Sequence, residues 1–181
     1  RWPRRTLLLA PIVAIVSYVA LAAIRSAVTS EFSWGARLAA WQIVLQIAQL
    51  NPLLGLGPAN YYYYTPLYSI LGYYIRFNSH NNYVDLIAQT GLLGTAAFFW
   101  FAAEFWREGW GLRHRVKSGF SQGYVAACLD GLVAMLITGM LGDWFLPFVY
   151  NVGISGFRAS ILFWVFLGGM ISLKRTDAQE A

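Results

Sequence analysis

Charged residues are scarce in this sequence. Only 12% of its 181 residues are Asp, Glu, Lys or Arg, whereas 58% are hydrophobic. A soluble domain of this length would carry about twice that charged fraction. The 13 basic residues are scattered or lie beside apolar runs, so no basic surface for a nucleic acid is expected. The composition therefore indicates an integral membrane protein and no nucleic-acid partner.

Cysteine and histidine are also nearly missing. Cys128 is the only cysteine, which excludes a disulfide within the chain. With one thiol and two imidazoles, a zinc site is not expected. No pair of acidic residues appears in the outer segment defined below, so a divalent cation has no obvious carboxylate cage there. We therefore expect neither a metal nor another cofactor.

Long apolar runs are abundant instead. A helix of about 20 apolar residues crosses the ~30 Å hydrocarbon core of a bilayer. Eight Trp, eleven Tyr and twelve Phe are typical of a protein with extensive membrane interfaces. A signal peptide is the alternative for the first run, but its length and the lack of a clear cleavage site favour a span. The sequence predicts an all-α integral membrane fold with four spans, at about residues 6–24, 83–105, 121–141 and 149–173.

The basic residues orient these spans. Most of them cluster in three groups: Arg1, Arg4 and Arg5; Arg107, Arg113, Arg115 and Lys117; Lys174 and Arg175. All three groups fall on one side of the predicted bundle, which the positive-inside rule makes cytoplasmic. Both chain ends are then inside, and residues 25–82 and 142–148 are outside. We interpret residues 1–181 as one membrane domain. Because the chain begins without Met, we expect it to be the C-terminal part of a longer protein.

The outer segment 25–82 is predicted to contain a helix. Apolar residues recur at helical spacing from residue 33 to residue 50, in "SWGARLAAWQIVLQIAQL". Asn51, Pro52 and two following glycines end this helix. A helix with one apolar stripe, followed by a cluster of tyrosines, is expected to lie along the outer membrane surface.

The stretch "NSHNNYVDLIAQTGLLG" places His80 at the head of the second span. Because imidazole titrates near neutrality, it can act as a general base towards a sugar hydroxyl. The alternative is a packed or capping residue. Asn81 can bind sugar hydroxyls or cap the following helix. Asp85 lies five residues after His80, a spacing that does not favour a carboxylate–imidazole pair.

Three arginines are candidates for a phosphate group, which a guanidinium can bind with two hydrogen bonds. Arg37 lies one turn before Trp41 in the outer helix, and Arg76 lies four residues before His80. For both, the alternative is contact with lipid headgroups. Arg158 is expected just inside the outer edge of the last span, where it must snorkel or pair. Asp143 is at nearly the right depth to be its partner.

Two stretches, "RLAAWQIVLQIAQLNPLLGLGPANY" and "HNNYVDLIAQTGLLG", resemble the C-terminal core of the O-antigen ligase and polymerase superfamily. The residues that match its pattern are His80, Asn81, Gly91 and Gly94 in the second stretch and Arg37 and Trp41 in the first. The resemblance implies the C-terminal part of a C-type membrane glycosyltransferase in the bacterial inner membrane. Such enzymes transfer glycan, without a metal, from an undecaprenyl diphosphate carrier to an acceptor hydroxyl on the outer face.

This resemblance also implies roles for single residues. His80 would activate the acceptor and Arg37 would stabilise the diphosphate. The candidate substrate-binding residues are Asn81, Arg76, Trp41 and Arg158. Gly91 and Gly94 are expected to let helices approach closely. The chain alone is expected to be inactive, because further spans and a second loop arginine are missing. The alternatives are a polysaccharide polymerase of the same superfamily and a non-enzymatic anchor or transporter fragment.

Overall fold

The computed structural model describes residues 18–19, 21, 31–116, 119–146 and 149–179. By its internal contacts the chain divides into two compact units, residues 1–39 and residues 40–181. Within the described ranges the secondary structure is helical, with no strand and one isolated bridge between Ile70 and Tyr73. The predicted all-α class is confirmed at this level. The first predicted span, residues 6–24, lies almost entirely outside the described residues.

Helix α2 (Glu31–Ala48) is the predicted outer helix, and it begins and ends two residues earlier than the sequence pattern indicates. The boundary between the two units falls inside it. In the first unit, Trp34 and the neighbouring Leu38 are exposed. The predicted end of the helix before Asn51 is confirmed, because turns follow from Gln49 onwards.

Two helices of the larger unit are long and apolar enough to span a membrane: α3 (Asn82–Arg113) and α4 (Phe120–Thr138). Only 28% and 22% of their most apolar windows are buried, whereas the core helix of a soluble protein would be mostly buried. Helix α5 (Val149–Gln179) covers the fourth predicted span, but its apolar part, Ser160–Leu173, is shorter. Four spans therefore remain a prediction.

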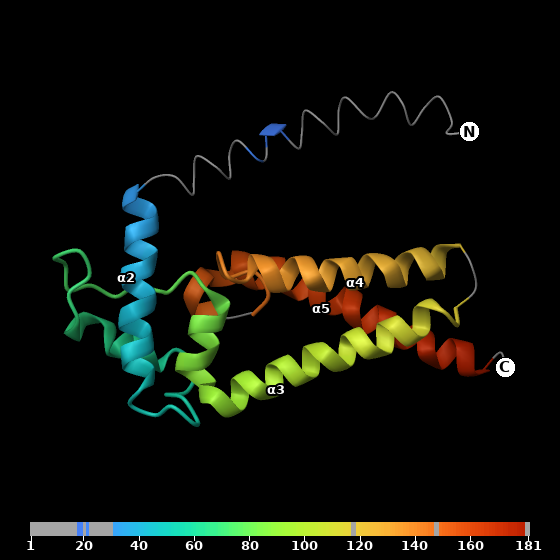
Figure 1. Cartoon of the computed structure of the whole chain (residues 1–181), viewed down its shortest axis with the longest axis horizontal. Helices are drawn as coiled ribbons and strands as arrows, with labels where there is room; N and C mark the ends of the chain where they lie inside the picture. Colours follow the sequence, from blue (N-terminus) through green and yellow to red (C-terminus); the bar gives the residue numbers. More distant parts are fainter. Residues whose placement is uncertain (1–17, 20, 22–30, 117–118, 147–148, 180–181) are drawn as a thin grey trace. The chain divides into compact units, whose positions relative to one another are not determined.

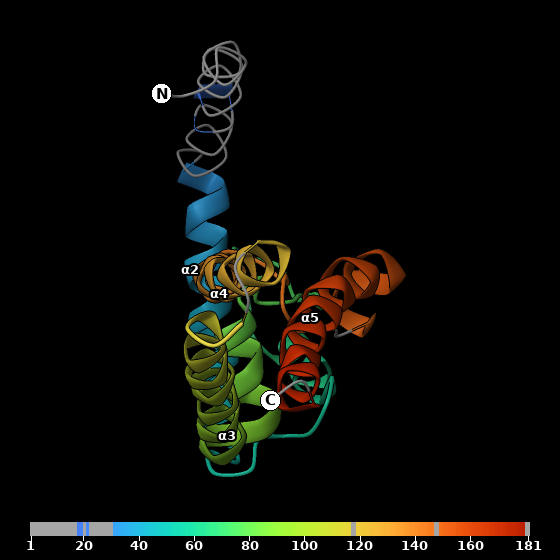
Figure 2. The ribbon, with the colours of Figure 1, turned by 90° about the vertical axis from the view of Figure 1, so that its right-hand side faces the viewer.

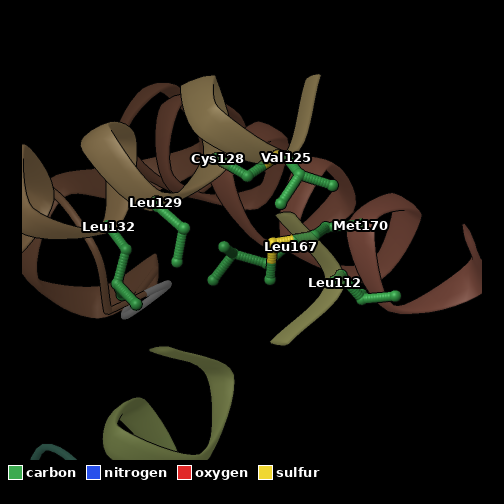
Figure 3. Close-up of a cluster of buried hydrophobic side chains, with 7 residues drawn as sticks. All are labelled: Leu112, Val125, Cys128, Leu129, Leu132, Leu167 and Met170. Carbon is green, nitrogen blue, oxygen red and sulfur yellow. The ribbon is translucent and has the colours of Figure 1, made fainter. Parts of the chain in front are cut away.

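The three long helices share one hydrophobic core. Figures 1 and 2 show α4 and α5 beside the second part of α3. Side chains from the end of α3 and from the facing sides of α4 and α5 fill the space between them (Figure 3). The buried members are Leu112, Val125, Cys128, Leu129, Leu132, Leu167 and Met170. This core leaves much of the outward surface of each helix free to face lipid.

A second core supports the polar head of α3. The second half of α2 packs against the first turns of α3 and against the tyrosine-rich loop, which includes η1 (Asn60–Tyr63) and η2 (Thr65–Leu67). Its buried members are Val44, Ile47, Ala48, Tyr61, Val84 and Ala88. The segment that carries His80 enters α3 beside this core, since Phe77 and Val84 both pack in it.

Helix α3 is broken at Gly91, whose φ of 65° and ψ of −168° are not helical. Figure 1 shows the change of direction. A helix end leaves backbone donors and acceptors without partners, and here the loop 52–57 supplies them. Leu56 and Gly57 donate to the carbonyls of Ala88 and Gln89, which end the first part of the helix. The carbonyls of Pro52 and Leu53 accept from Leu92 and Leu93, which begin the second part.

The break corrects the prediction that Gly91 and Gly94 serve helix–helix packing. A Cβ on Gly91 would overlap the backbone of Leu53 and Gly55, so the close approach is to a loop. A Cβ on Gly94 would meet the side chain of Thr90, which lies on the other side of the break. The positive φ and the loop contact together require glycine at position 91.

Candidate functional site

Asn81 caps α3. Its side-chain oxygen accepts hydrogen bonds from the backbone N–H groups of Tyr83 (2.9 Å) and Val84 (3.3 Å). The capping alternative for Asn81 is therefore confirmed. A contact between the same amide and a substrate stays a prediction. His80 precedes the cap with a φ of 49°, in the left-handed region. His is among the few residue types other than Gly that are enriched there, and a functional constraint often accompanies it.

His80 is paired with a carboxylate from a distant part of the chain. Its Nδ1 lies 3.3 Å from Oδ2 of Asp143, in the turn between α4 and α5. The imidazole is 58% exposed, whereas the Asp143 side chain is 3% exposed. Asn78 joins the two residues, because its Nδ2 donates to Asp143 Oδ2 (3.1 Å) and its Oδ1 accepts from the His80 backbone N–H (2.6 Å). With a proton held on Nδ1, the lone pair of Nε2 is available to a substrate.

The surroundings of Asp143 keep it ionised. Burial raises its pKa, but this effect is outweighed by hydrogen bonds from His80 and Asn78, by the charge of His80 and by the neighbouring Asp85 side chain. The net result is a pKa below the ordinary value for aspartate. A carboxylate in this state orients an imidazole and stabilises the protonated ring.

The backbone next to His80 is fixed by Ser79, which is fully buried. Its carbonyl accepts from the indole N–H of Trp41 (2.7 Å), and its hydroxyl accepts from the Asn81 N–H and lies 2.8 Å from Asp85 Oδ1. Tyr61 donates to the same carboxylate oxygen at 2.7 Å. Burial, followed by the charge of Asp85, raises the pKa of Tyr61, so its hydroxyl remains a donor. Trp41 therefore holds the residue before His80.

The three candidate arginines lie in different places. Arg37 is half-buried and belongs to the unit 1–39, so its position opposite His80 stays a prediction. Arg76 is exposed, and its guanidinium lies 5.4 Å above the ring of Tyr63. Arg158 is exposed on α5. The predicted pairing of Arg158 with Asp143 is not found among the described residues, because the ion pair of Asp143 is with His80.

The sequence did not identify Asp143 as the partner of His80. Its signal was topological: Asp143 is the acidic residue of the short turn predicted outside, on the side where His80 also lies. Ser79 and Asn78 carried no signal beyond their position beside the histidine. As to metals, the described part of the chain contains no group of three His, Cys, Asp or Glu side chains suited to an ion.

Helices of spanning length, with a histidine–aspartate pair at the head of one of them, define a helical protein of membrane type that carries a polar site. A family model described as O-antigen ligase matches residues 1–99, and the chain belongs to that family. The match contains Arg37, Trp41, Arg76 and His80 and ends before Asp143. Neither the curated proteins nor the solved structures compared with the chain gave a match.

Proposed function

We propose that this chain carries the acceptor-activating site of a membrane glycosyltransferase of the O-antigen ligase type. The donor is a glycan on undecaprenyl diphosphate and the acceptor is a hydroxyl on the outer face of the bacterial inner membrane. The observation that carries the proposal is the pair of His80 with Asp143, in which an exposed imidazole is oriented by a buried carboxylate. It lies at the head of an apolar helix in a chain of this family.

In the proposed reaction, Nε2 of His80 accepts the proton of the acceptor hydroxyl as the oxygen attacks the anomeric carbon. The bond from that carbon to the diphosphate oxygen breaks, and the bonding electrons leave with the diphosphate. Asp143 stabilises the imidazolium that forms. The exposed ring then releases its proton to water. Direct attack inverts the configuration at the anomeric carbon.

Arg37 has the complementary task in this proposal. Negative charge gathers on the diphosphate as the anomeric bond breaks, and a guanidinium stabilises that charge most where it develops. The fork of arginine binds a phosphate with two hydrogen bonds, which a lysine cannot reproduce. Arg37 therefore contributes to donor binding as well as to rate, whereas His80 contributes to rate.

The test is glycan transfer by the complete protein in lipid nanodiscs, with a polyprenyl diphosphate-linked donor. His80→Ala should lower the transfer rate by about 10² to 10⁴-fold, with donor binding retained. Arg37→Ala should weaken donor binding and rate, and Arg37→Lys should restore little. A chelator should have no effect. The matched control is His114→Ala, because His114 is the chain's other histidine and contacts Trp110 at the far end of α3.

The outcomes separate the alternatives. Full activity of His80→Ala, or a loss of activity with chelator, would overturn the proposed mechanism. Offering lipid, glycan and protein acceptors in turn distinguishes a ligase from a polymerase, since only the latter extends glycan of its own kind. A non-enzymatic anchor or a transporter fragment would transfer nothing to any of the three.

A further inference from the structure

Asn82, the first residue of α3, has a side chain that the proposed reaction does not use. It is fully buried. Its neighbour Asn81 already caps the helix, so the Asn82 amide is not needed there. Instead, Oδ1 of Asn82 accepts hydrogen bonds from two consecutive backbone N–H groups, those of Trp144 (2.8 Å) and Phe145 (3.1 Å). These are the two residues that follow Asp143.

Asn82 also binds the beginning of the same turn. Its backbone N–H donates to the carbonyl of Gly139 at 2.8 Å, where α4 ends. One residue of α3 thus holds residues 139 and 144–145 of the turn. The Phe145 ring is buried beside Leu86, also of α3, whereas the Phe145 carbonyl accepts from the indole of Trp164 in α5 at 2.7 Å. The turn is therefore fixed between α3 and α5.

The Asp143 side chain contributes little anchoring of its own outside the site. Its Oδ2 contacts His80 and Asn78. Its Oδ1 is buried and has no hydrogen-bond partner among the described residues. The direction from which the carboxylate approaches His80 is consequently set by the backbone of the turn, and the backbone N–H groups beside it are held by Asn82.

We propose that Asn82 is a positioning residue for the reaction: its side-chain carbonyl holds the turn 139–146 so that Asp143 meets Nδ1 of His80. The inference rests on the proposed role of His80 as the base. Asn82 touches neither substrate nor the reacting atoms, and it acts on the imidazole through the turn and through Asp143.

The direct test of the contact is hydrogen exchange of the complete protein in nanodiscs. Asn82→Ala leaves the N–H groups of Trp144 and Phe145 without their acceptor, which is unfavourable above all for the buried Phe145. The turn should relax, and exchange in the peptide that covers residues 142–146 should become faster. In the transfer assay, kcat should fall by about tenfold or more, as for other residues that orient a functional group. KM for the lipid-linked donor should stay unchanged.

Asn82→Asp keeps the proposal testable if the alanine variant does not fold. An aspartate retains the acceptor, and Nδ2 of Asn82 has no partner among the described residues, so the substitution removes no described hydrogen bond. It adds a negative charge beside Asp143, where the other titratable neighbours are His80, Asp85 and Tyr62. Burial, followed by the charges of Asp85 and Asp143, raises the pKa of Tyr62 to about 12, so Tyr62 is neutral in the assay.

The added negative charge favours the protonated form of the His80 imidazole, so that the ring loses its proton at a higher pH. Asn82→Asp should therefore protect residues 142–146 from exchange as the native protein does, while the acid limb of the rate profile moves to higher pH. Retained protection in Asn82→Asp, against faster exchange in Asn82→Ala, assigns the effect on the turn to the acceptor oxygen of residue 82. Thr65→Val is the matched control: Thr65 is equally buried and its hydroxyl binds a backbone carbonyl, of Tyr62, outside the turn. It should change neither the exchange of residues 142–146 nor the pH profile.

Two results would overturn the inference: unchanged exchange or unchanged kcat in Asn82→Ala, or faster exchange of residues 142–146 in Asn82→Asp, which retains the acceptor. Either is distinguishable from failure of the proposed function. If His80→Ala is fully active, the role of His80 as the base is wrong, whatever Asn82 does. If His80→Ala is inactive and the Asn82 variants give either of the two results above, only the positioning role of Asn82 is wrong.

Discussion

At the scale of single residues, His80 combines an exposed side chain with a left-handed backbone. Neighbouring side chains on both sides hold this conformation, since Asn78 accepts from the His80 N–H and Asn81 caps the helix. A side chain with a Cβ costs about 1–2 kcal/mol in this region, and glycine does not. His80 is thus held in its place at some expense to stability.

This backbone separates two substitutions that both remove the imidazole. His80→Gly should be more stable than His80→Ala by about 1 kcal/mol, because glycine adopts the left-handed conformation freely. Both variants should be inactive in transfer. Thermal unfolding in detergent measures the difference. Equal stability of the two variants would show that position 80 does not keep its positive φ.

The lowered pKa of Asp143 has a defined pH dependence. A carboxyl whose pKa is lower in the folded protein stabilises it above the pKa of the unfolded chain, and this stabilisation is lost as the pH falls through the folded value. In the unfolded chain an aspartate has a pKa of about 4. At about pH 5 and above, the native protein should therefore be more stable than Asp143→Asn. The difference should shrink below that range. Thermal unfolding of both proteins between about pH 3 and pH 7 tests this, and a difference that grows in acid would contradict it.

At the scale of elements, the helices were predictable and the break in α3 was not. The periodic apolar residues gave α2 to within two residues, and α4 follows the apolar run from which it was predicted. Gly91 lies in a run that reads as continuous helix, and the partners of its neighbours come from a loop more than thirty residues earlier. His80 and Asp143 lie more than sixty positions apart in the sequence. Contacts of this range have no local signal, so the sequence pointed to His80 but not to its carboxylate partner.

The break predicts a large effect from a small change. Gly91→Ala would place a methyl group against the backbone of Leu53 and Gly55 and would strain a positive φ. We expect a loss of about 2 kcal/mol or more in stability. The matched control is Gly123→Ala in α4, where an added Cβ meets nothing within 4 Å; it should be neutral or stabilise by up to about 1 kcal/mol. Thermal unfolding compares the two, and equal effects would show that the loop yields easily.

At the scale of the whole molecule, the orientation in the membrane is the prediction to test. The basic residues place positions 37 and 80 outside and positions 113 and 174 inside. Single cysteines at these four positions, in a Cys128→Ala background, should react with an impermeant maleimide on intact cells only at 37 and 80. All four should react after the membrane is opened. Labelling of position 113 from outside would contradict the predicted topology.

The break at Gly91 also decides which residues of α3 move when the helix gains or loses a residue. An inserted residue in a continuous helix turns everything beyond it by about 100°. Residues 82–90, which carry Asp85 and follow His80, end at the break and are tied to the loop 52–57 by backbone hydrogen bonds. An insertion after Gly94 would rotate and lengthen only the remaining span. The second part of α3 can therefore change in length, as bilayers of different thickness would require of a span, without re-aiming the residues at its head.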